Sequence, residues 1–170
     1  TREGSSGNYN ATFNTSHFPD GTYNITVFVN DTEGNLNSTG LARRVRFDNT
    51  QPLNVNISST PASGTNHSHN SESGNLTLNV TVLDATTDIS IVFFQLVNST
   101  GNLNKSFTGI REGSSDRWSV TLNTSHLPDG FYNITVFVND SAGNTNSTTI
   151  FFTLDTTAPA VKITAPTNSS

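Results

Sequence analysis

Cysteine and methionine are absent from this sequence of 170 residues, and charged side chains are scarce, at 12% of the total. The lack of cysteine excludes the disulfide-stapled domains that are common on animal cell surfaces. Only 8 lysines and arginines stand against 13 acidic residues, whereas a nucleic-acid interface needs clustered basic side chains. No apolar run approaches the roughly 18 residues of a membrane-spanning helix. No signal peptide is visible, as in a mature or internal segment. We therefore expect neither a nucleic-acid partner nor a membrane span here.

Polar uncharged residues are unusually abundant, with 23 asparagines and 48 serines and threonines. Random placement of this composition would give about six Asn-x-Ser/Thr sequons, x not being proline. The chain has 16, which predicts dense covalent N-glycosylation and an extracellular surface. The alternative is a polar β-rich surface, because threonine favours strands and asparagine favours turns. The sequon asparagines are Asn10, Asn14, Asn24, Asn30, Asn37, Asn56, Asn66, Asn75, Asn79, Asn98, Asn104, Asn123, Asn133, Asn139, Asn146 and Asn168.

Apolar residues recur with a period of two, which is typical of half-buried β-strands. Tyr132, Ile134 and Val136 alternate with Asn133 and Thr135, so the sequon asparagine falls on the polar face. Short antiparallel strands in this number fit an all-β fold of two-sheet sandwiches, with about seven strands per domain. The predicted strands of one domain lie near 53–58, 75–84, 89–98, 102–108, 116–122, 131–139 and 147–155.

The chain repeats itself. Residues 14–35 and 123–144 are identical at 18 of 22 positions. The offset between them is 109 residues, which is the length of one small domain. This period divides the chain into the C-terminal half of one repeat (1–48), a complete repeat (49–156) and the first strand of the next (157–170). The apolar side chains of 1–48 would lie open to water, so we expect the natural protein to be longer.

Several motifs stand at equivalent places in the two repeats. Asp20–Tyr23 reads DGTY and Asp129–Tyr132 reads DGFY, and the hairpins Asp31–Asn35 and Asp140–Asn144 follow them. Asp155–Pro159 reads DTTAP. These motifs resemble the bacterial and archaeal immunoglobulin-like repeats (Big type) of cell-surface proteins. The resemblance implies tandem immunoglobulin-like sandwiches on the cell exterior. With the dense sequons and the lack of cysteine, it predicts an archaeal source.

Some members of that family bind calcium at the joints between domains. The resemblance therefore implies Asp129, Asp140 and Asp155 as candidate calcium ligands, with isolated turn capping as the alternative reading. His17 and His126 hold the same loop position in both repeats, which favours a structural role. No Ser–His–Asp set, paired carboxylates or phosphate-binding glycine loop is present, so we predict no catalytic residue and no other cofactor.

Four phenylalanines are expected to point outward from the predicted strands: Phe28, Phe137, Phe131 and Phe151. Two alternative explanations account for these outward rings. Neighbouring strands or the cores of attached glycans would account for them within one molecule. Lateral packing between copies is the other account, because aromatic residues are enriched in interface cores.

Taken together, the residues and the resemblance predict a non-enzymatic structural component of an extracellular filament, stalk or cell-surface coat. It would associate with itself into a polymer or array. Two alternatives stay open from the sequence. One is the spacer or stalk of an adhesin or carbohydrate-binding surface protein. The other is a set of accessory domains in a secreted enzyme.

Overall fold

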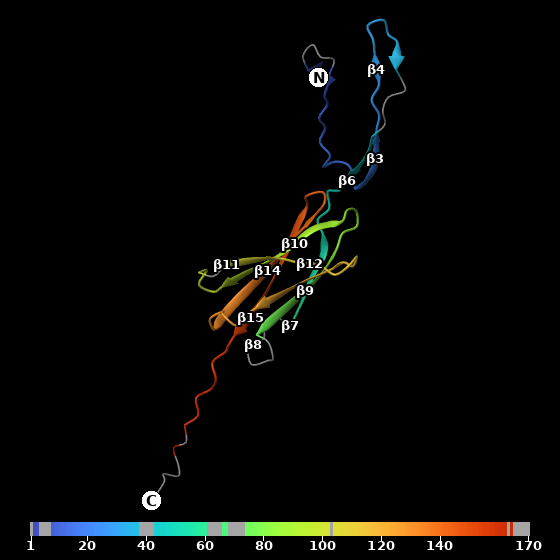
Figure 1. The fold of residues 1–170 in the computed structure, drawn as a ribbon. Helices are drawn as coiled ribbons and strands as arrows, with labels where there is room; N and C mark the ends of the chain where they lie inside the picture. Colours follow the sequence, from blue (N-terminus) through green and yellow to red (C-terminus); the bar gives the residue numbers. More distant parts are fainter. Residues whose placement is uncertain are drawn as a thin grey trace, which may run out of the picture.

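The computed structural model describes residues 2–3, 8–37, 43–60, 66–67, 74–102, 104–162 and 164. Within them the regular secondary structure is entirely β (Figure 1). The N-terminal strands are β1 (Arg2–Glu3), β2 (Asn8–Tyr9), β3 (Gly21–Ile25), β4 (Val29–Asn30), β5 (Leu36–Asn37) and β6 (Arg43–Phe47). The others are β7 (Leu53–Thr60), β8 (Asn66–His67), β9 (Asn75–Leu83), β10 (Ile89–Asn98), β11 (Asn104–Thr108), β12 (Ile110–Arg111), β13 (Arg117–Asn123), β14 (Gly130–Asp140) and β15 (Thr145–Leu154).

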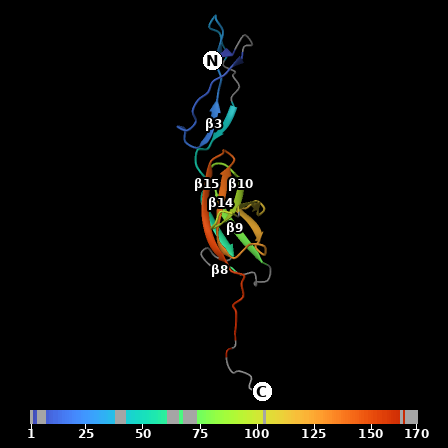
Figure 2. The ribbon, with the colours of Figure 1, turned by 90° about the vertical axis from the view of Figure 1, so that its left-hand side faces the viewer.

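Strands β7 to β15 form a sandwich of two sheets (Figure 2). One sheet has the order β11-β10-β14-β15-β8 and the other β12-β13-β9-β7. Neighbouring strands run antiparallel, except that β8 pairs with β15 in parallel. The predicted all-β fold and all seven strands predicted between residues 53 and 155 are confirmed. The short strands β8 and β12 were not predicted.

The core between the sheets follows the predicted alternation. On β14, Tyr132, Ile134 and Val136 are buried while Asn133 is exposed. The side chains that β9 contributes from the facing sheet are equally buried, because every second residue of each strand points inward. The buried apolar set is Leu76, Leu78, Val80, Val82, Ile89, Val92, Phe94, Leu96, Trp118, Leu122, Leu127, Tyr132, Ile134, Val136, Val138, Phe152 and Leu154.

The N-terminal part pairs β3 with β6 and β4 with β5. Its aromatic side chains cluster on one side, where the rings of Tyr23 and Phe47 stack at 4.8 Å between centroids. Phe13 and Phe18 contact Phe47 edge-on or tilted. Several apolar side chains of this part lie open to solvent, among them that of Phe13, which is 48% exposed.

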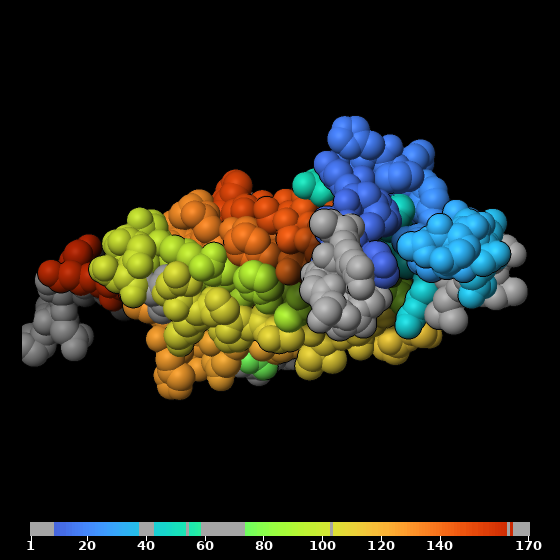
Figure 3. Space-filling view, turned by 90° about the horizontal axis from the view of Figure 1, so that it is seen from above, coloured from blue at the N-terminus to red at the C-terminus, as the bar shows by residue number. Residues whose placement is uncertain are grey.

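The N-terminal part and the sandwich lie end to end. In two perpendicular views, residues 8–37 and 43–47 extend from one end of the sandwich, and residues 155–162 leave from the opposite end (Figure 1, Figure 2). Seen from above, the N-terminal residues in blue lie in front of one side of the sandwich (Figure 3). Among the residues that the structure describes, no helix has the length and apolar character needed to cross a membrane.

Gly109 lies where the chain crosses from one sheet to the other, between β11 and β12. Its amide donates to the Val92 carbonyl at 2.8 Å. A Cβ here would lie 3.1 Å from the Phe94 ring and 3.2 Å from the Val92 carbonyl oxygen. Because the backbone carbonyl has little room to move, Gly109→Ala should lower the free energy of unfolding by about 1–3 kcal/mol. Urea unfolding measures this, with the exposed Ser106→Ala as a control; equal losses in both variants would contradict the account.

Candidate functional site

The segment from Asp48 to Pro52 connects the N-terminal part to the sandwich, and both sides hold it. On the N-terminal side, the Asp20 carboxylate accepts hydrogen bonds from the Thr50 hydroxyl and from the Asn49 amide, the latter at 2.7 Å. The Asn49 side chain donates to the Phe18 carbonyl at 3.0 Å. Because Thr50 and Asn49 donate to the charged form, they hold the pKa of Asp20 below its ordinary value.

On the sandwich side, Asp48 and Pro52 are themselves buried. The Asp48 carboxylate accepts a hydrogen bond from the Thr87 hydroxyl at 2.6 Å. The carbonyl of Asp48 accepts one from the Asn144 side chain at 3.1 Å, and the carbonyl of Pro52 accepts one from the Asn146 side chain at 2.7 Å. The linker is therefore bonded to residues of both units, which restricts bending at this joint.

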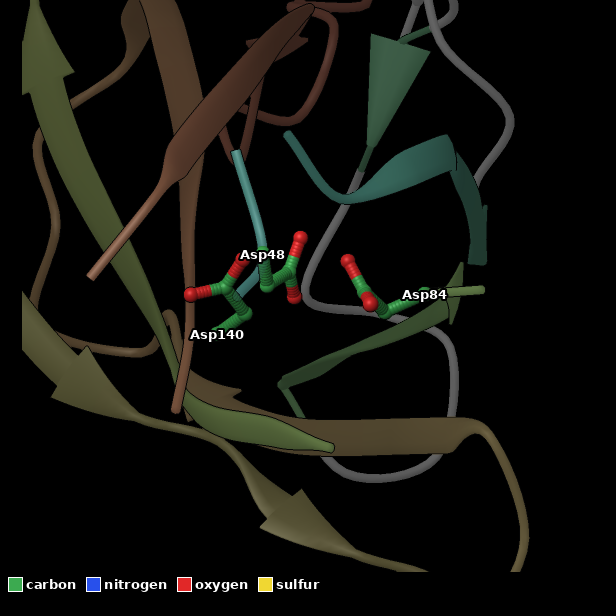
Figure 4. Close-up of side chains that lie close together, drawn as sticks. All are labelled: Asp48, Asp84 and Asp140. Carbon is green, nitrogen blue, oxygen red and sulfur yellow. The ribbon is translucent and has the colours of Figure 1, made fainter. Parts of the chain in front are cut away.

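Three aspartates meet at this joint (Figure 4). Asp48 belongs to the linker, Asp84 to the loop after β9, and Asp140 to the end of β14. One carboxylate oxygen from each lies within 4.8 Å of the other two. Asp48 is 8% exposed and Asp140 is 3% exposed, so negative charge is concentrated where little water screens it.

The hydrogen bonds of these carboxylates differ. The Asp140 carboxylate accepts from three successive backbone amides of the hairpin, at residues 142 to 144, over 2.7–2.9 Å. In Asp84, Oδ1 accepts from the Thr86 and Thr87 amides, whereas Oδ2 is buried with no hydrogen-bond partner. In the described part of the chain, no lysine or arginine forms an ion pair with the three aspartates.

A divalent cation would fit this arrangement. Hard cations such as Ca²⁺ take carboxylate and carbonyl oxygens as ligands, and a bound cation offsets the repulsion between close carboxylates. The buried Oδ2 of Asp84 is the kind of atom that such a cation would satisfy. Asp48, Asp84 and Asp140 would hold the ion, which would then connect the linker to the loop after β9 and to the end of β14.

The structure does not bring together the three aspartates that the resemblance implied. Asp140 lies at one end of β14, while Asp129 precedes the other end of this 11-residue strand. Asp129 instead accepts hydrogen bonds from the Thr156 amide at 2.8 Å and the Thr157 hydroxyl at 2.6 Å. This repeats the contact of Asp20 with the linker, so the joint contact recurs one domain further along the chain.

Sequence reasoning missed Asp48 and Asp84. The alignment of the two linkers contained the signal for Asp48, because Asp48 occupies the position of Asp155 in the other repeat. Their contacts agree: the Asp48 carboxylate accepts from the Thr50 amide at 3.1 Å, and the Asp155 carboxylate from the Thr157 amide at 3.2 Å. Asp155 therefore holds, in the second linker, the position that Asp48 holds in the first. No local motif marks Asp84.

Each repeat has a corner tyrosine that follows its Pro-Asp-Gly turn. The Tyr23 hydroxyl donates to the Pro19 carbonyl and the Tyr132 hydroxyl to the Pro128 carbonyl, each at 2.7 Å. Burial raises the pKa of the Tyr132 phenol, and the Asp129 carboxylate acts in the same direction. Each bond fixes the Pro-Asp-Gly turn that carries the linker-binding aspartate.

Sequon asparagines lie on the surface wherever the structure describes their side chains. The side chain of Asn66 and the whole of Asn168 lie outside the described residues. None of the other sequon asparagines is buried; Asn79, Asn98, Asn139 and Asn146 are half-buried and the remainder are exposed. Asn146 occupies an inward position of β15, opposite the buried Val138, and its amide nitrogen donates to the Pro52 carbonyl. A glycan on that nitrogen would disturb the linker.

The outward phenylalanines form two ring pairs on the five-stranded sheet. Phe137 stacks on Phe93 with 4.8 Å between centroids and 12° between planes. Phe131 and Phe151 lie 5.5 Å apart and are both exposed. Phe28 is 61% exposed, but it falls between β3 and β4 and not within a strand as the sequence predicted.

Comparison with models of protein families shows to which family this chain belongs. The sequence model of the bacterial Ig-like domain matches residues 49–156. The chain belongs to this family. The described residues fit the bacterial Ig-like domain in their two-sheet sandwich and corner tyrosine. The family is generally non-catalytic. A search of curated proteins finds no match.

Several solved structures are similar to this chain at low sequence identity, each with a TM-score below 0.5. A tetra-tandem repeat in the extending region of a large adhesion protein is 22% identical with a TM-score of 0.49, over 82% of this chain and 33% of that one. The endo-β-1,4-mannanase from Thermotoga petrophila is 15% identical with a TM-score of 0.47, over 65% of this chain and 21% of that one. CopC from Methylosinus trichosporium OB3b is 18% identical with a TM-score of 0.43, over 61% of this chain and 95% of that one. The chain thus spans a third or less of the adhesion protein and mannanase chains.

Proposed function

We propose that this chain belongs to a non-enzymatic structural protein of the cell exterior. In it, bacterial Ig-like domains join end to end into a filament, a stalk or a surface coat. The hydrogen bonds of the linker are the observation that supports this proposal. It is bonded to Asp20 on one side and to Thr87 and Asn144 on the other, and Asp129 repeats the first contact at the next joint. Joints held in this way favour a stiff rod, in which each domain contacts its neighbours along one axis.

N-glycosylation of the exposed sequons is part of the proposal, and with it an extracellular location. Glycans would cover strand edges, which other proteins protect with charged side chains that are scarce here. Self-association into an array is the expected partnership, and an archaeal source accords with many sequons and no cysteine. The surface positions of the sequon asparagines support this reading.

Electron microscopy of the native protein tests the structural role. The length of β14, 11 residues, implies domains spaced by about 4 nm along a rod. We expect linear rows of such units on the cell surface or in released material. Compact particles without linear rows, or a hydrolytic activity that resides in these domains, would contradict the proposal.

Peptide mapping by mass spectrometry tests the glycosylation separately. Exposed sites such as Asn75, Asn104 and Asn133 should carry sugars, so that the mass of this segment exceeds the 18.2 kDa of the polypeptide. Asn146 should remain unmodified because its amide nitrogen is bonded to the linker. Unmodified asparagine at all exposed sites would remove this part of the proposal.

A cation at the joint is the remaining proposal, and Asp84 provides the test. Adding Ca²⁺ to chelator-treated protein should raise the melting temperature of the full chain, because the ion binds only the folded joint. Asp84→Asn should abolish that rise. In chelator the same variant should melt no lower than the unchanged chain, because it removes a negative charge whose Oδ2 is buried without a hydrogen-bond partner. Identical melting of the unchanged chain with Ca²⁺ and with chelator would exclude the site.

A further inference from the structure

Asn133 stands among apolar side chains on the outer face of the five-stranded sheet. Its direct cross-strand neighbours are Phe151 on β15 and Val97 on β10, and Phe131 precedes it by two residues on the same face of β14. Direct cross-strand neighbours have Cβ atoms about 5 Å apart, and residues two apart on a strand are the next nearest. The sequon asparagine therefore lies beside both rings of the Phe131–Phe151 pair.

The two rings are accessible at this place. Phe131 is 40% exposed, Phe151 is 48% exposed, and Asn133 between them is also exposed. The ring centroids are 5.5 Å apart with 32° between the planes, so the rings present a shallow surface and not a closed pocket. A sugar attached to the side-chain nitrogen of Asn133 would begin at the edge of this surface.

We propose that the first sugar of the Asn133 glycan packs against the Phe131–Phe151 pair. This inference rests on the proposed N-glycosylation. The face of an aromatic ring is electron-rich, and the C–H groups of a pyranose ring carry slight positive charge, so the two attract when stacked. The contact also removes two exposed phenylalanine rings from water. The rings thus act as a support for a sugar that the same strand carries.

A neighbouring copy of the chain is the other occupant that the sequence allowed for these rings. Asn133 lies directly opposite Phe151, at the patch itself and not at its margin. A glycan on the side-chain nitrogen of Asn133 would hold another protein surface away from both rings. The same grouping occurs at the second ring pair, where Phe137 precedes the sequon Asn139 by two residues and Ile91 lies opposite Asn139.

The N-terminal repeat supplies a matched comparison. Asn24 is the equivalent sequon, with Thr22 two residues before it and Arg44 directly opposite it. The two phenylalanines are thus replaced by a threonine and an arginine around an otherwise identical Asn-Ile-Thr sequence. Exchanging Phe131→Thr and Phe151→Arg transfers residues that this fold already accepts at the same register.

The experiment uses the full chain, secreted from a eukaryotic host that N-glycosylates and then trimmed to single N-acetylglucosamine residues. Mass spectrometry first establishes that Asn133 is occupied. The double variant Phe131→Thr/Phe151→Arg is then compared with the unchanged chain, once with Asn133 intact and once with Asn133→Gln. We expect the aromatic replacement to reduce the folding equilibrium constant about 2- to 10-fold more when the sugar is present.

Nuclear magnetic resonance provides a second readout that does not depend on stability. The N-acetyl and ring protons of the sugar at Asn133 should be shifted upfield by the aromatic rings, and the double variant should lose that shift. Equal effects of the aromatic replacement in both backgrounds, with no upfield shift at an occupied Asn133, would overturn this inference alone. So would association of the glycosylated chain that the replacement abolishes. Absence of sugar at Asn133 and the other exposed sequons would instead overturn the proposed glycosylation.

Discussion

Replacing Phe94 with alanine should lower the free energy of unfolding of the sandwich by about 3–5 kcal/mol. Phe94 is completely buried, lies opposite Val136 on the neighbouring strand, and contacts the backbone crossing at Gly109. Its removal would leave a cavity between the sheets. The surrounding strands cannot fill this cavity, because hydrogen bonds to neighbouring strands fix the backbone of each strand. Trp118, the single tryptophan, lies in the same core and reports unfolding by fluorescence in urea.

Phe93 is the matched control for this prediction. It adjoins Phe94 on β10 but points to the outer face, where it stacks on Phe137. Phe93→Ala should lower the free energy of unfolding by only about 1 kcal/mol, the contribution of an aromatic pair. Equal losses for the two variants would mean that the register of β10 is wrong, since a shift by one residue exchanges the two faces of a strand.

Replacing Asp140 with alanine should lower the free energy of unfolding, measured in chelator, by about 2–4 kcal/mol. The carboxylate is nearly inaccessible and accepts hydrogen bonds from three hairpin amides and from the Asn144 side chain at 2.8 Å. Alanine would leave these donors without an acceptor in a place that water reaches poorly. It would also release Asn144, which holds the carbonyl of Asp48 in the linker.

Two variants separate the causes. Asp140→Asn keeps an acceptor oxygen and removes the charge, so its loss should be smaller than that of Asp140→Ala. Asp31 caps the equivalent hairpin of the N-terminal repeat, with bonds to the Glu33 and Asn35 amides and the Asn35 side chain. Because that hairpin lies outside the sandwich, Asp31→Ala should leave the unfolding of the sandwich unchanged. A large effect of Asp31→Ala there, or none of Asp140→Ala, would contradict the account.

Much of the fold could be predicted because its information is local. The alternation of Tyr132, Ile134 and Val136 with Asn133 determines which face of β14 is buried, without knowledge of its neighbours. The Pro-Asp-Gly turn and its tyrosine likewise depend on residues only a few positions apart. The crossing at Gly109 was not predicted, because only the approach of Val92 and Phe94 makes a side chain unfavourable there.

The candidate metal cluster was harder to derive because its members are distant in sequence and belong to different units. Asp48 lies in the linker, Asp84 in the loop after β9, and Asp140 at the end of β14. The resemblance indicated that aspartates gather at joints, but not which joint each one serves. The contact of Asn146 could not be derived for a similar reason: its sequon matches the others, while its position on β15 directs its amide to the Pro52 carbonyl.

The paths of β7 and β15 decide how the domain responds to tension. The chain enters through Pro52 at the start of β7 and leaves after Leu154 at the far end of β15. A pull on both ends would slide β7 lengthwise along β9, and β15 along β14, so that many ladder hydrogen bonds resist at once. Peeling from one end, which breaks bonds singly, is avoided. A rod of such domains would transmit force along its axis with its strands still paired.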